Sequence, residues 1–304
     1  MIATLLAATT LAALPLQQSP AARQATRQAP DTTFEVSKGQ RLAVEVFAGA
    51  VTVKTWDRSA VRVRAVDMGA RAELDIERDG PTVSVEVGGR HGTPTSADLE
   101  VTAPAWMAIS LEGVHTDMTV AGINAPIALE TVSGNLDVQG GRETVELQTV
   151  EGTISLRGAQ GRLSLSSVNN AVTVTGAKGE LTVETVNGAI RLDDVDVTSL
   201  DLSTVNGNVG FRGPLRDDGS YVLTSHNGAI DLAIAGEPDA NFSVSTFGGE
   251  LTTEFAISVG GERGSRRGKR VNFTLGGGSA QVELESFNGR ITLRRAGSAP
   301  ASSR

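Results

Sequence analysis

The chain has 304 residues, a formal net charge of −8, no cysteine, 35 glycines and only 4% aromatic residues. The negative charge disfavours a nucleic-acid-binding protein, which needs a basic surface, and the lack of cysteine excludes disulfides, thiol catalysis and cysteine-ligated metals. Many glycines combined with few aromatic residues predict many turns around a core of small aliphatic side chains.

The N-terminus predicts an exported protein. Residues 2–14 are apolar and uncharged, and small residues follow them. Such a run is too short to cross a bilayer and is typical of a secretory signal peptide, here with cleavage near Ala21 or Ala22. We therefore expect a signal peptide at 1–22, then a disordered linker at 23–32. The mature chain is expected in the periplasm, the cell envelope or the medium, with no transmembrane segment of its own.

Residues 33–108 contain several runs of alternating apolar and polar residues, separated by turn signals such as Gly88-Gly89. Alternation with period two indicates a strand with one buried face. One run, LAVEVFAGAVTV at 42–53, weakly echoes the repeat that follows. We predict a β-rich N-terminal module that caps the repeat region, with a boundary near residue 108.

A twelve-residue frame recurs from residue 109 onward. It reads apolar-x-apolar-x-Thr/Ser, then Val/Phe/His-Asn-Gly, then x-apolar-x-apolar, and LTVETVNGAIRL at 181–192 is its clearest copy. The copies occupy 109–120, 127–138, 145–156, 163–174, 181–192, 200–211, 221–232, 242–253 and 282–293. The last interval, of 40 residues, is twice the others, and predicts one additional coil containing RVNFTLGGG at 270–278.

Two architectures fit this frame. Asn-Gly is a strong hairpin signal, so each copy can be an antiparallel hairpin. Alternatively, each copy is one coil of a parallel β-solenoid that turns at Asn-Gly, using residues that tolerate positive φ. The near-constant spacing favours the solenoid, because stacked coils need equal lengths and separate hairpins do not. We predict an all-β parallel β-solenoid (β-helix) of 18–21-residue coils at 109–295, followed by a disordered tail at 296–304.

Identical residue types also recur in columns, as stacking would require. Position five is Thr or Ser in every copy from 127 onward. Position seven is asparagine in five copies, at Asn169, Asn187, Asn206, Asn227 and Asn288. Like side chains would lie about 4.8 Å apart, close enough for the amides to bond along the column.

Within a coil, the apolar positions of the frame are expected to point inward and positions two and four of the first strand outward. The inward set of the copy at 181–192 is Leu181, Val183, Val186, Ile190 and Leu192. The outward columns form a flat polar face, which is acidic in patches and suits an extended neutral or cationic glycan, or a partner protein. The candidate binding surface on this face is Glu146, Gln148, Thr182, Glu184, Asp201 and Ser203.

The order of the short motifs resembles a known family. A G-x-V-x-V-x-x-W-D motif at 49–57 and V-x-A-P at 101–104 precede tandem T-V-N-G-x-I repeats and a closing GGGSAQVELESFNGRI at 276–291. This arrangement resembles the putative-adhesin family catalogued as domain of unknown function 4097, a β-strand-repeat family, over roughly residues 33–295. The resemblance implies an exported or envelope-associated bacterial β-solenoid and brings no established catalytic residue.

Motifs for catalysis or metal binding are absent from the sequence. His91, His115 and His226 lack metal-ligand spacing, and no serine stands in G-x-S-x-G or S-x-x-K. We expect no catalytic, cofactor-binding or metal-binding residues and no cofactor. A basic loop at 262–270 is expected to be a solvated insertion, with binding of an anionic polymer as its alternative. Its cations are Arg263, Arg266, Arg267, Lys269 and Arg270.

Two functions from different classes remain. The first is a non-enzymatic envelope protein for adhesion, scaffolding or surface recognition, whose partner is an envelope protein or polysaccharide and not a nucleic acid. The second is a polysaccharide-processing β-helix enzyme that acts through carboxylates in the turns between coils. The carboxylates in question are Asp193, Asp194, Asp196, Asp217 and Asp218.

Overall fold

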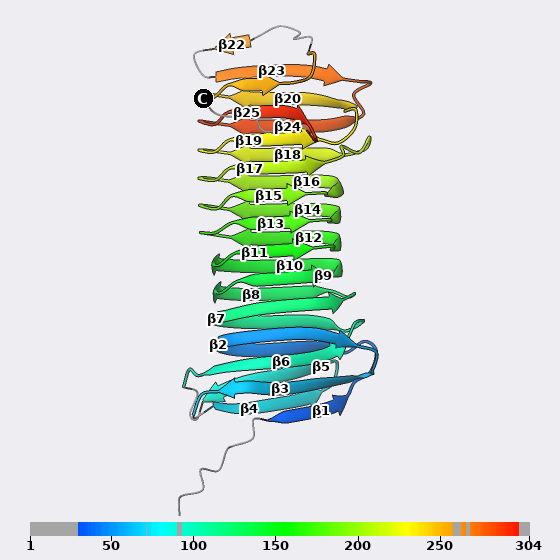
Figure 1. The fold of residues 1–304 in the computed structure, drawn as a ribbon, viewed down its shortest axis with the longest axis vertical. Helices are drawn as coiled ribbons and strands as arrows, with labels where there is room; N and C mark the ends of the chain where they lie inside the picture. Colours follow the sequence, from blue (N-terminus) through cyan, green and yellow to red (C-terminus); the bar gives the residue numbers. More distant parts are fainter. Residues whose placement is uncertain (1–29, 71, 90–92, 258–262, 266–267, 298–304) are drawn as a thin grey trace, which may run out of the picture.

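The computed structural model of the chain describes residues 30–70, 72–89, 93–257, 263–265 and 268–297. The predicted signal peptide lies outside these ranges, as do most of the predicted linker and tail and part of the basic loop. The described residues form β-strands and turns stacked into a tall column (Figure 1). None of the described residues belongs to a helix long and apolar enough to span a membrane.

Each repeat coil from residue 127 onward contributes two strands, one on either side of the core. The first strands are β8 (Ile127–Ser133), β10 (Arg142–Glu151), β12 (Gln160–Ser167), β14 (Lys178–Thr185), β16 (Asp196–Thr204) and β18 (Ser220–Ser225). The second strands are β9 (Leu136–Gly140), β11 (Ile154–Arg157), β13 (Val172–Thr175), β15 (Ile190–Asp193), β17 (Val209–Gly213) and β19 (Ile230–Ile234). Within each set, every strand pairs in parallel with its counterpart in the next coil. The predicted parallel solenoid is therefore confirmed.

The core lies between the two sets of strands, and the copy at 181–192 shows how it is filled. Leu181, Val183, Ile190 and Leu192 are at most 2% exposed, as predicted. Val186 is 41% exposed, so its predicted inward orientation is wrong. The alternation of the first strand continues into the corner, so position five points inward and position six outward.

The buried residue at position five is Thr or Ser because its hydroxyl ties one corner to the next. In one step of this chain, the Gly188 N–H donates to Thr185 Oγ1 at 3.1 Å, and Thr204 Oγ1 of the following coil donates to the Gly188 carbonyl at 3.2 Å. Buried polar groups without partners are costly, so a hydroxyl that both accepts and donates here satisfies itself and the backbone of the turn. The recurrence of Thr and Ser at this position has a structural cause.

The Asn-Gly corner requires glycine at position 188 because there is no room for a side chain, and not because the backbone there has a positive φ. Left-handed residues occur instead at the opposite, return corner of the coils, at Gly158 (φ 68°), Gly176 (φ 66°) and Asp194 (φ 54°). The expectation that the Asn-Gly corner uses positive φ is wrong. A Cβ on Gly188 would lie only 2.0 Å from the carbonyl oxygen of Asn170, which holds the same position in the preceding coil. The coils approach too closely at Gly188 for a side chain.

At the N-terminal end, β2 (Arg41–Trp56) and β7 (Ala108–Ile123) run parallel side by side along most of their length. The other edge of β2 pairs in parallel with β5 (Thr82–Gly89) and β6 (Ser96–Pro104). The strands that end the stack are antiparallel to their neighbours: β4 (Ala72–Asp79) pairs with β5, β3 (Ala60–Met68) with β6, and β1 (Asp31–Glu35) with β3. The weak echo of the frame at 42–53 thus lies within a coil stacked directly on the repeats.

At the C-terminal end the chain order and the stacking order differ (Figure 1). Strand β24 (Ala280–Ser286) lies between β18 and β20 (Ala240–Thr246), and β25 (Ile291–Arg295) lies between β19 and β21 (Leu251–Thr253). The last copy is therefore inserted beneath the copy that precedes it in sequence. In this order Asn288 continues the asparagine column, which Gly248 of the 242–253 copy lacks the side chain to do.

The predicted extra coil at 270–278 is wrong. Strand β23 (Gly268–Leu275) pairs antiparallel with β20 and forms a hairpin with β22 (Arg263–Ser265). An antiparallel strand ends a parallel stack, so this segment is a cap at the C-terminal end.

Asp239 anchors the turn that leads from β23 back to β24. Its carboxylate accepts hydrogen bonds from the backbone N–H groups of Gly278 and Ser279 and from the Ser279 hydroxyl at 3.0 Å. These bonds, above all the one from the Ser279 side chain, lower the pKa of Asp239. The turn that makes the insertion possible is thus held in place by a charged acceptor.

We expect Ala at position 188 to destabilise the protein far more than Ala at position 158. Gly158 is left-handed with no atom near its missing Cβ, so Gly158→Ala should cost about 1 kcal/mol of backbone strain. Gly188→Ala must push two coils apart and should cost about 3 kcal/mol or more. Urea unfolding followed by circular dichroism measures both, and equal losses would contradict the spatial role of Gly188.

We expect Asp239→Asn to lower the urea midpoint more at pH 7 than at pH 2.5. Because the pKa of Asp239 is lower in the folded state, its charged form stabilises the fold above the unfolded pKa of about 4, and this contribution is lost as the pH falls through the folded pKa. Asp217→Asn removes an exposed carboxylate in another loop and serves as the control. An equal deficit for Asp239→Asn at both pH values would show that its charge is not responsible.

Candidate binding surfaces

The six predicted surface residues lie together on the outer face of the first strands. All six are exposed, and the register places them in two neighbouring columns. The position-two column contains Glu146, Ser164, Thr182 and Asp201, and the position-four column contains Gln148, Ser166, Glu184 and Ser203. Glu146 and Gln148 also contact each other, with Gln148 Nε2 donating to Glu146 Oε1 at 2.6 Å. The strands present these groups as a flat, regular array.

The position-four column continues as a row of carboxylates toward the N-terminal end. Glu130, Glu112, Glu45 and Glu86 are consecutive neighbours in register across β8, β7, β2 and β5. All four are exposed, and none has an ion pair or side-chain hydrogen bond among the residues that the structure describes. Sequence reasoning missed this row because Glu45 and Glu86 lie outside the repeats and join it only through the stacking of β5, β2 and β7.

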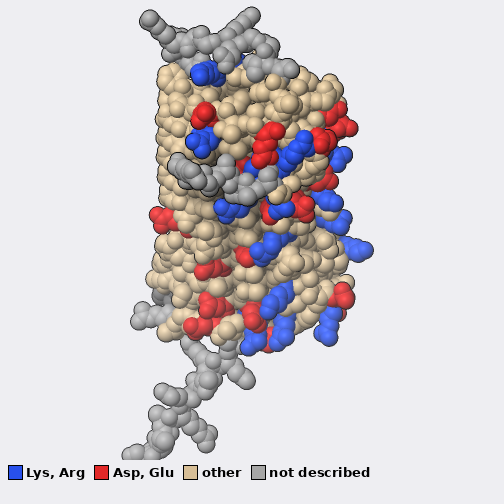
Figure 2. Space-filling model, turned by 45° about the horizontal axis from the view of Figure 1, so that its top comes forward, with Lys and Arg blue, Asp and Glu red and all other residues tan. Residues whose placement is uncertain are grey.

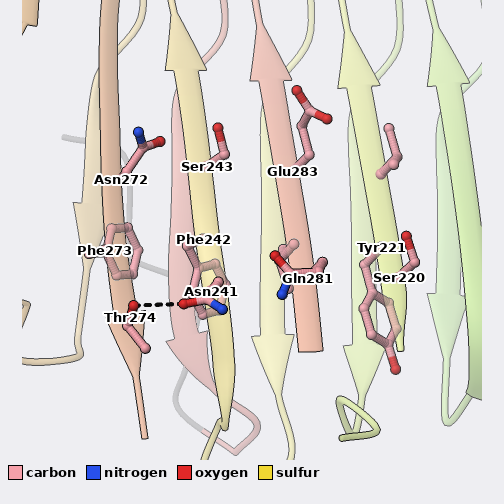
Figure 3. Close-up of a pocket in the computed structure, with 12 residues that line it drawn as sticks. Ser220, Tyr221, Asn241, Phe242, Ser243, Asn272, Phe273, Thr274, Gln281 and Glu283 are labelled. Carbon is pink, nitrogen blue, oxygen red and sulfur yellow. Dashed lines mark hydrogen bonds between the residues drawn. The ribbon is translucent and has the colours of Figure 1, made fainter. Parts of the chain in front are cut away.

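The C-terminal part of the same face has a shallow hollow of about 510 Å³ across β18, β24, β20 and β23 (Figure 3). Two rows of side chains cross it in register. The first row contains Ser220, Gln281, Asn241 and Thr274, and the second contains Val222, Glu283, Ser243 and Asn272. The hollow depends on the insertion of β24 and on the antiparallel β23, neither of which the repeat frame predicts.

Most polar groups of the hollow are free to bind a ligand. Asn241 and Thr274 bond to each other at 2.7 Å, and the Asn241 amide also donates to the Gly278 carbonyl at 2.7 Å. The Tyr221 hydroxyl donates to the Val197 carbonyl at 2.9 Å. Within the described part of the chain, the other five polar side chains of the hollow have no such partners. These are Ser220, Ser243, Asn272, Gln281 and Glu283. The site offers hydroxyl, amide and one carboxylate group, and its lining contains no cation.

The turn carboxylates considered for catalysis lie at the return corner, and three of them form ion pairs. Arg212 lies 3.2 Å from Asp193 of the preceding coil, and Arg216 lies 3.1 Å from Asp196 and 3.8 Å from Asp218. The hydrogen bond that Arg216 donates to Asp196 is the main cause of the raised pKa of Arg216. Figure 2 shows charged groups of both signs gathered along one side of the column. Asp193 and Asp196 therefore have a structural explanation as links between neighbouring turns, and Asp218 pairs with Arg216 within its own turn.

The asparagine column forms a hydrogen-bonded ladder, as predicted. Each side-chain amide donates to the carbonyl oxygen of the preceding asparagine, over 3.0 Å from Asn187 to Asn169, 2.9 Å from Asn206 to Asn187, 2.8 Å from Asn227 to Asn206 and 2.9 Å from Asn288 to Asn227. The ladder runs along the exposed corner and joins five coils.

The histidines make aromatic contacts. His226 stacks on Phe287 with ring centroids 4.8 Å apart, and His115 meets the edge of Phe47 at 5.9 Å. His91 lies outside the described residues. Among the residues that the structure describes, no three His, Asp or Glu side chains are grouped to hold a metal ion.

Comparison with known proteins agrees with this architecture. The family described as Toastrack DUF4097 matches residues 40–294. The chain belongs to this family. No curated protein matches it.

Three solved structures are similar to this Toastrack protein over most of their length. A putative cell adhesion protein from Clostridium sporogenes has 10% identity and a TM-score of 0.25, with 88% of this chain and 99% of that chain covered. A putative adhesin from Parabacteroides distasonis has 12% identity and a TM-score of 0.39, with 87% and 96% covered. A putative adhesin from Bacteroides fragilis has 10% identity and a TM-score of 0.32, with 88% and 98% covered.

Proposed function

We propose that this Toastrack protein is an exported, non-catalytic recognition protein of the cell envelope. It holds an extended neutral or cationic polysaccharide against the outer face of its first strands, in adhesion or as a scaffold. The observation that carries the proposal is the flat array of exposed polar side chains on this face, which ends in the hollow across β18, β24, β20 and β23.

The chemistry of this face suits a polymer of hydroxyl-bearing units. Ser220, Ser243, Asn272 and Gln281 supply hydroxyl and amide groups, which both donate and accept hydrogen bonds. The parallel strands repeat such groups at about 4.8 Å per step, so the face can contact many units of a chain in succession. Weak contacts repeated along one rigid surface add up without a deep pocket.

The charge of the face favours a neutral or cationic polymer over an anionic one. Glu146, Glu184, Asp201 and Glu283 are exposed there. An anionic polymer would be repelled by these groups, whereas a cationic one would be attracted to them.

Export is proposed from the sequence of residues 2–14, which has the apolar character of a signal peptide. Polysaccharides and surface proteins are the partners that an exported solenoid would meet. N-terminal sequencing of the protein recovered from its native location tests this part of the proposal, and an intact Met1 would contradict it.

We expect the purified protein to be retained on cellulose or chitosan and not on polygalacturonate. The double variant Glu184→Lys with Asp201→Lys should bind chitosan at least tenfold more weakly, because attraction becomes repulsion. The variant Asn272→Ala with Gln281→Ala should weaken binding to the neutral polymer.

The matched control is Asp57→Lys with Asp217→Lys, which changes the charge equally away from this face and should bind as wild type does. All variants are first checked for an unchanged urea midpoint. If the folded face variants retain full binding, the array is only a solvated surface and the proposal fails.

A further inference from the structure

A continuous row of exposed or half-buried, mostly apolar side chains runs along the Asn-Gly corner. We call this row the apolar stripe. Its members at position six of the coils, in stacking order and preceded by Phe47 of β2, are Phe47, Val114, Val132, Val150, Val168, Val186, Val205, His226, Phe287 and Phe247. Val132 is 48% exposed, Val205 43% and Phe247 52%. At about 4.8 Å per step the stripe is about 43 Å long.

Folding alone does not account for the stripe. The corner is held by the buried hydroxyl at position five and by the asparagine ladder, and position six takes part in neither through its side chain. Strand propensity favours threonine at a strand end as well as valine or phenylalanine, so it does not explain why the exposed column is apolar. Contiguous apolar patches larger than a few hundred Å² are rare on soluble proteins and mark interaction sites.

At the C-terminal end the stripe is an ordered aromatic stack. The rings of His226 and Phe287 lie 4.8 Å apart at 9° to each other, and those of Phe287 and Phe247 lie 4.7 Å apart at 1°. Stacking fixes these large side chains without burying them. A partner that contacts them therefore loses little further side-chain entropy on the side of this protein.

The charges beside the stripe indicate what can cover it. Position four, two residues before each stripe residue, carries the row of Glu86, Glu45, Glu112 and Glu130. On the other flank, position seven carries the uncharged asparagine ladder from Asn169 onward. Nearer the N-terminal end, the same position carries His115, Ser133 and Glu151. No Lys or Arg occupies positions four, six or seven of any repeat copy. An apolar row flanked by unpaired carboxylates is complementary to an apolar row flanked by cations.

The same charges argue against a second copy of this chain. Pairing two stripes would bring two acidic rows together in a protein that already has a net charge of −8. They argue equally against an anionic lipid surface, which would be repelled.

We propose that the apolar stripe and its acidic flank form the docking surface for a cationic amphipathic polypeptide. The partner's apolar side chains cover the stripe, and its Lys and Arg side chains pair with the glutamates at position four. This surface lies beside the proposed polysaccharide face, and its essential residues differ from those tested there, so either proposal can fail without the other.

The probe is a fluorescein-labelled helical peptide of three identical heptads, each with four Leu on one face and three Lys on the other, about 32 Å long. Binding is followed by fluorescence anisotropy at 50 mM and 500 mM NaCl. We expect saturable binding that weakens with salt, because part of it is electrostatic. We expect at least tenfold weaker binding of a peptide with the same composition in scrambled order, and of a peptide with Ser in place of Leu.

Two protein variants separate the two parts of the surface. Val132→Thr with Val150→Thr and Val186→Thr keeps the branched shape of the strand end but makes the stripe polar, and should weaken binding at least tenfold at both salt concentrations. Glu112→Gln with Glu130→Gln should weaken binding at 50 mM NaCl and reduce its dependence on salt. Asp57→Asn with Asp217→Asn removes the same charge elsewhere and should bind as wild type does.

Unchanged binding by the folded threonine variant would overturn the proposal. If the scrambled or Ser-containing peptide bound as tightly as the amphipathic one, binding would be only general charge attraction, and the proposal would also fail. Sedimentation velocity tests the competing occupant. A wild-type dimer that the threonine substitutions convert to a monomer would assign the stripe to a second copy and overturn the proposal as well.

Discussion

The whole molecule depends on one constraint: each coil can satisfy its backbone only by bonding to another coil in fixed register. A coil of two short strands has no partner strand within itself, so its N–H and C=O groups must meet those of its neighbours. Fixed register then forces equal positions into columns. A residue type that recurs at one position of the frame is thus repeated at short intervals along one line of the protein. This holds for the buried leucines, the hydroxyls at position five, the amides and the carboxylates alike.

This constraint explains why the corner is built as it is. Successive coils come so close at Gly188, Gly207, Gly228 and Gly289 that the backbone of the neighbouring coil leaves no room for a side chain. The carbonyl groups of these glycines would be left without partners, and the hydroxyls of the next coil, such as that of Thr204, bond to them. Outside, the amides of the asparagine ladder bond to each other. Close packing of the glycines, the hydroxyl bonds and the asparagine ladder thus constrain the other positions of the corner. The side chain at position six takes part in none of these interactions.

A stack of parallel strands must also be ended, because its last edge would otherwise pair with another chain. Both ends use antiparallel strands for this purpose, β1, β3 and β4 at one end and β22 and β23 at the other. The ends also shape the surface. At the N-terminal end β2 and β5 extend the glutamate row, and at the C-terminal end β23 and the inserted β24 make the hollow. The glutamate row and the hollow thus lie where the regular repeats meet the antiparallel caps.

The sequence alone was sufficient for the parallel solenoid, the columns at positions five and seven, and the outward face with Glu184 and Asp201, because these follow from period and alternation, which are local. It was insufficient in three respects. It placed Val186 inside, since an apolar residue next to a turn does not reveal on which side of the corner it lies. It assigned Gly188 to positive φ, since a close approach between coils leaves no mark in the sequence of one coil. It predicted an extra coil at 270–278, since the order of the copies along the chain does not show that β24 lies between β18 and β20. The glutamate row, the hollow and the apolar stripe all depend on which coils become neighbours, and only the packing of the complete chain decides that.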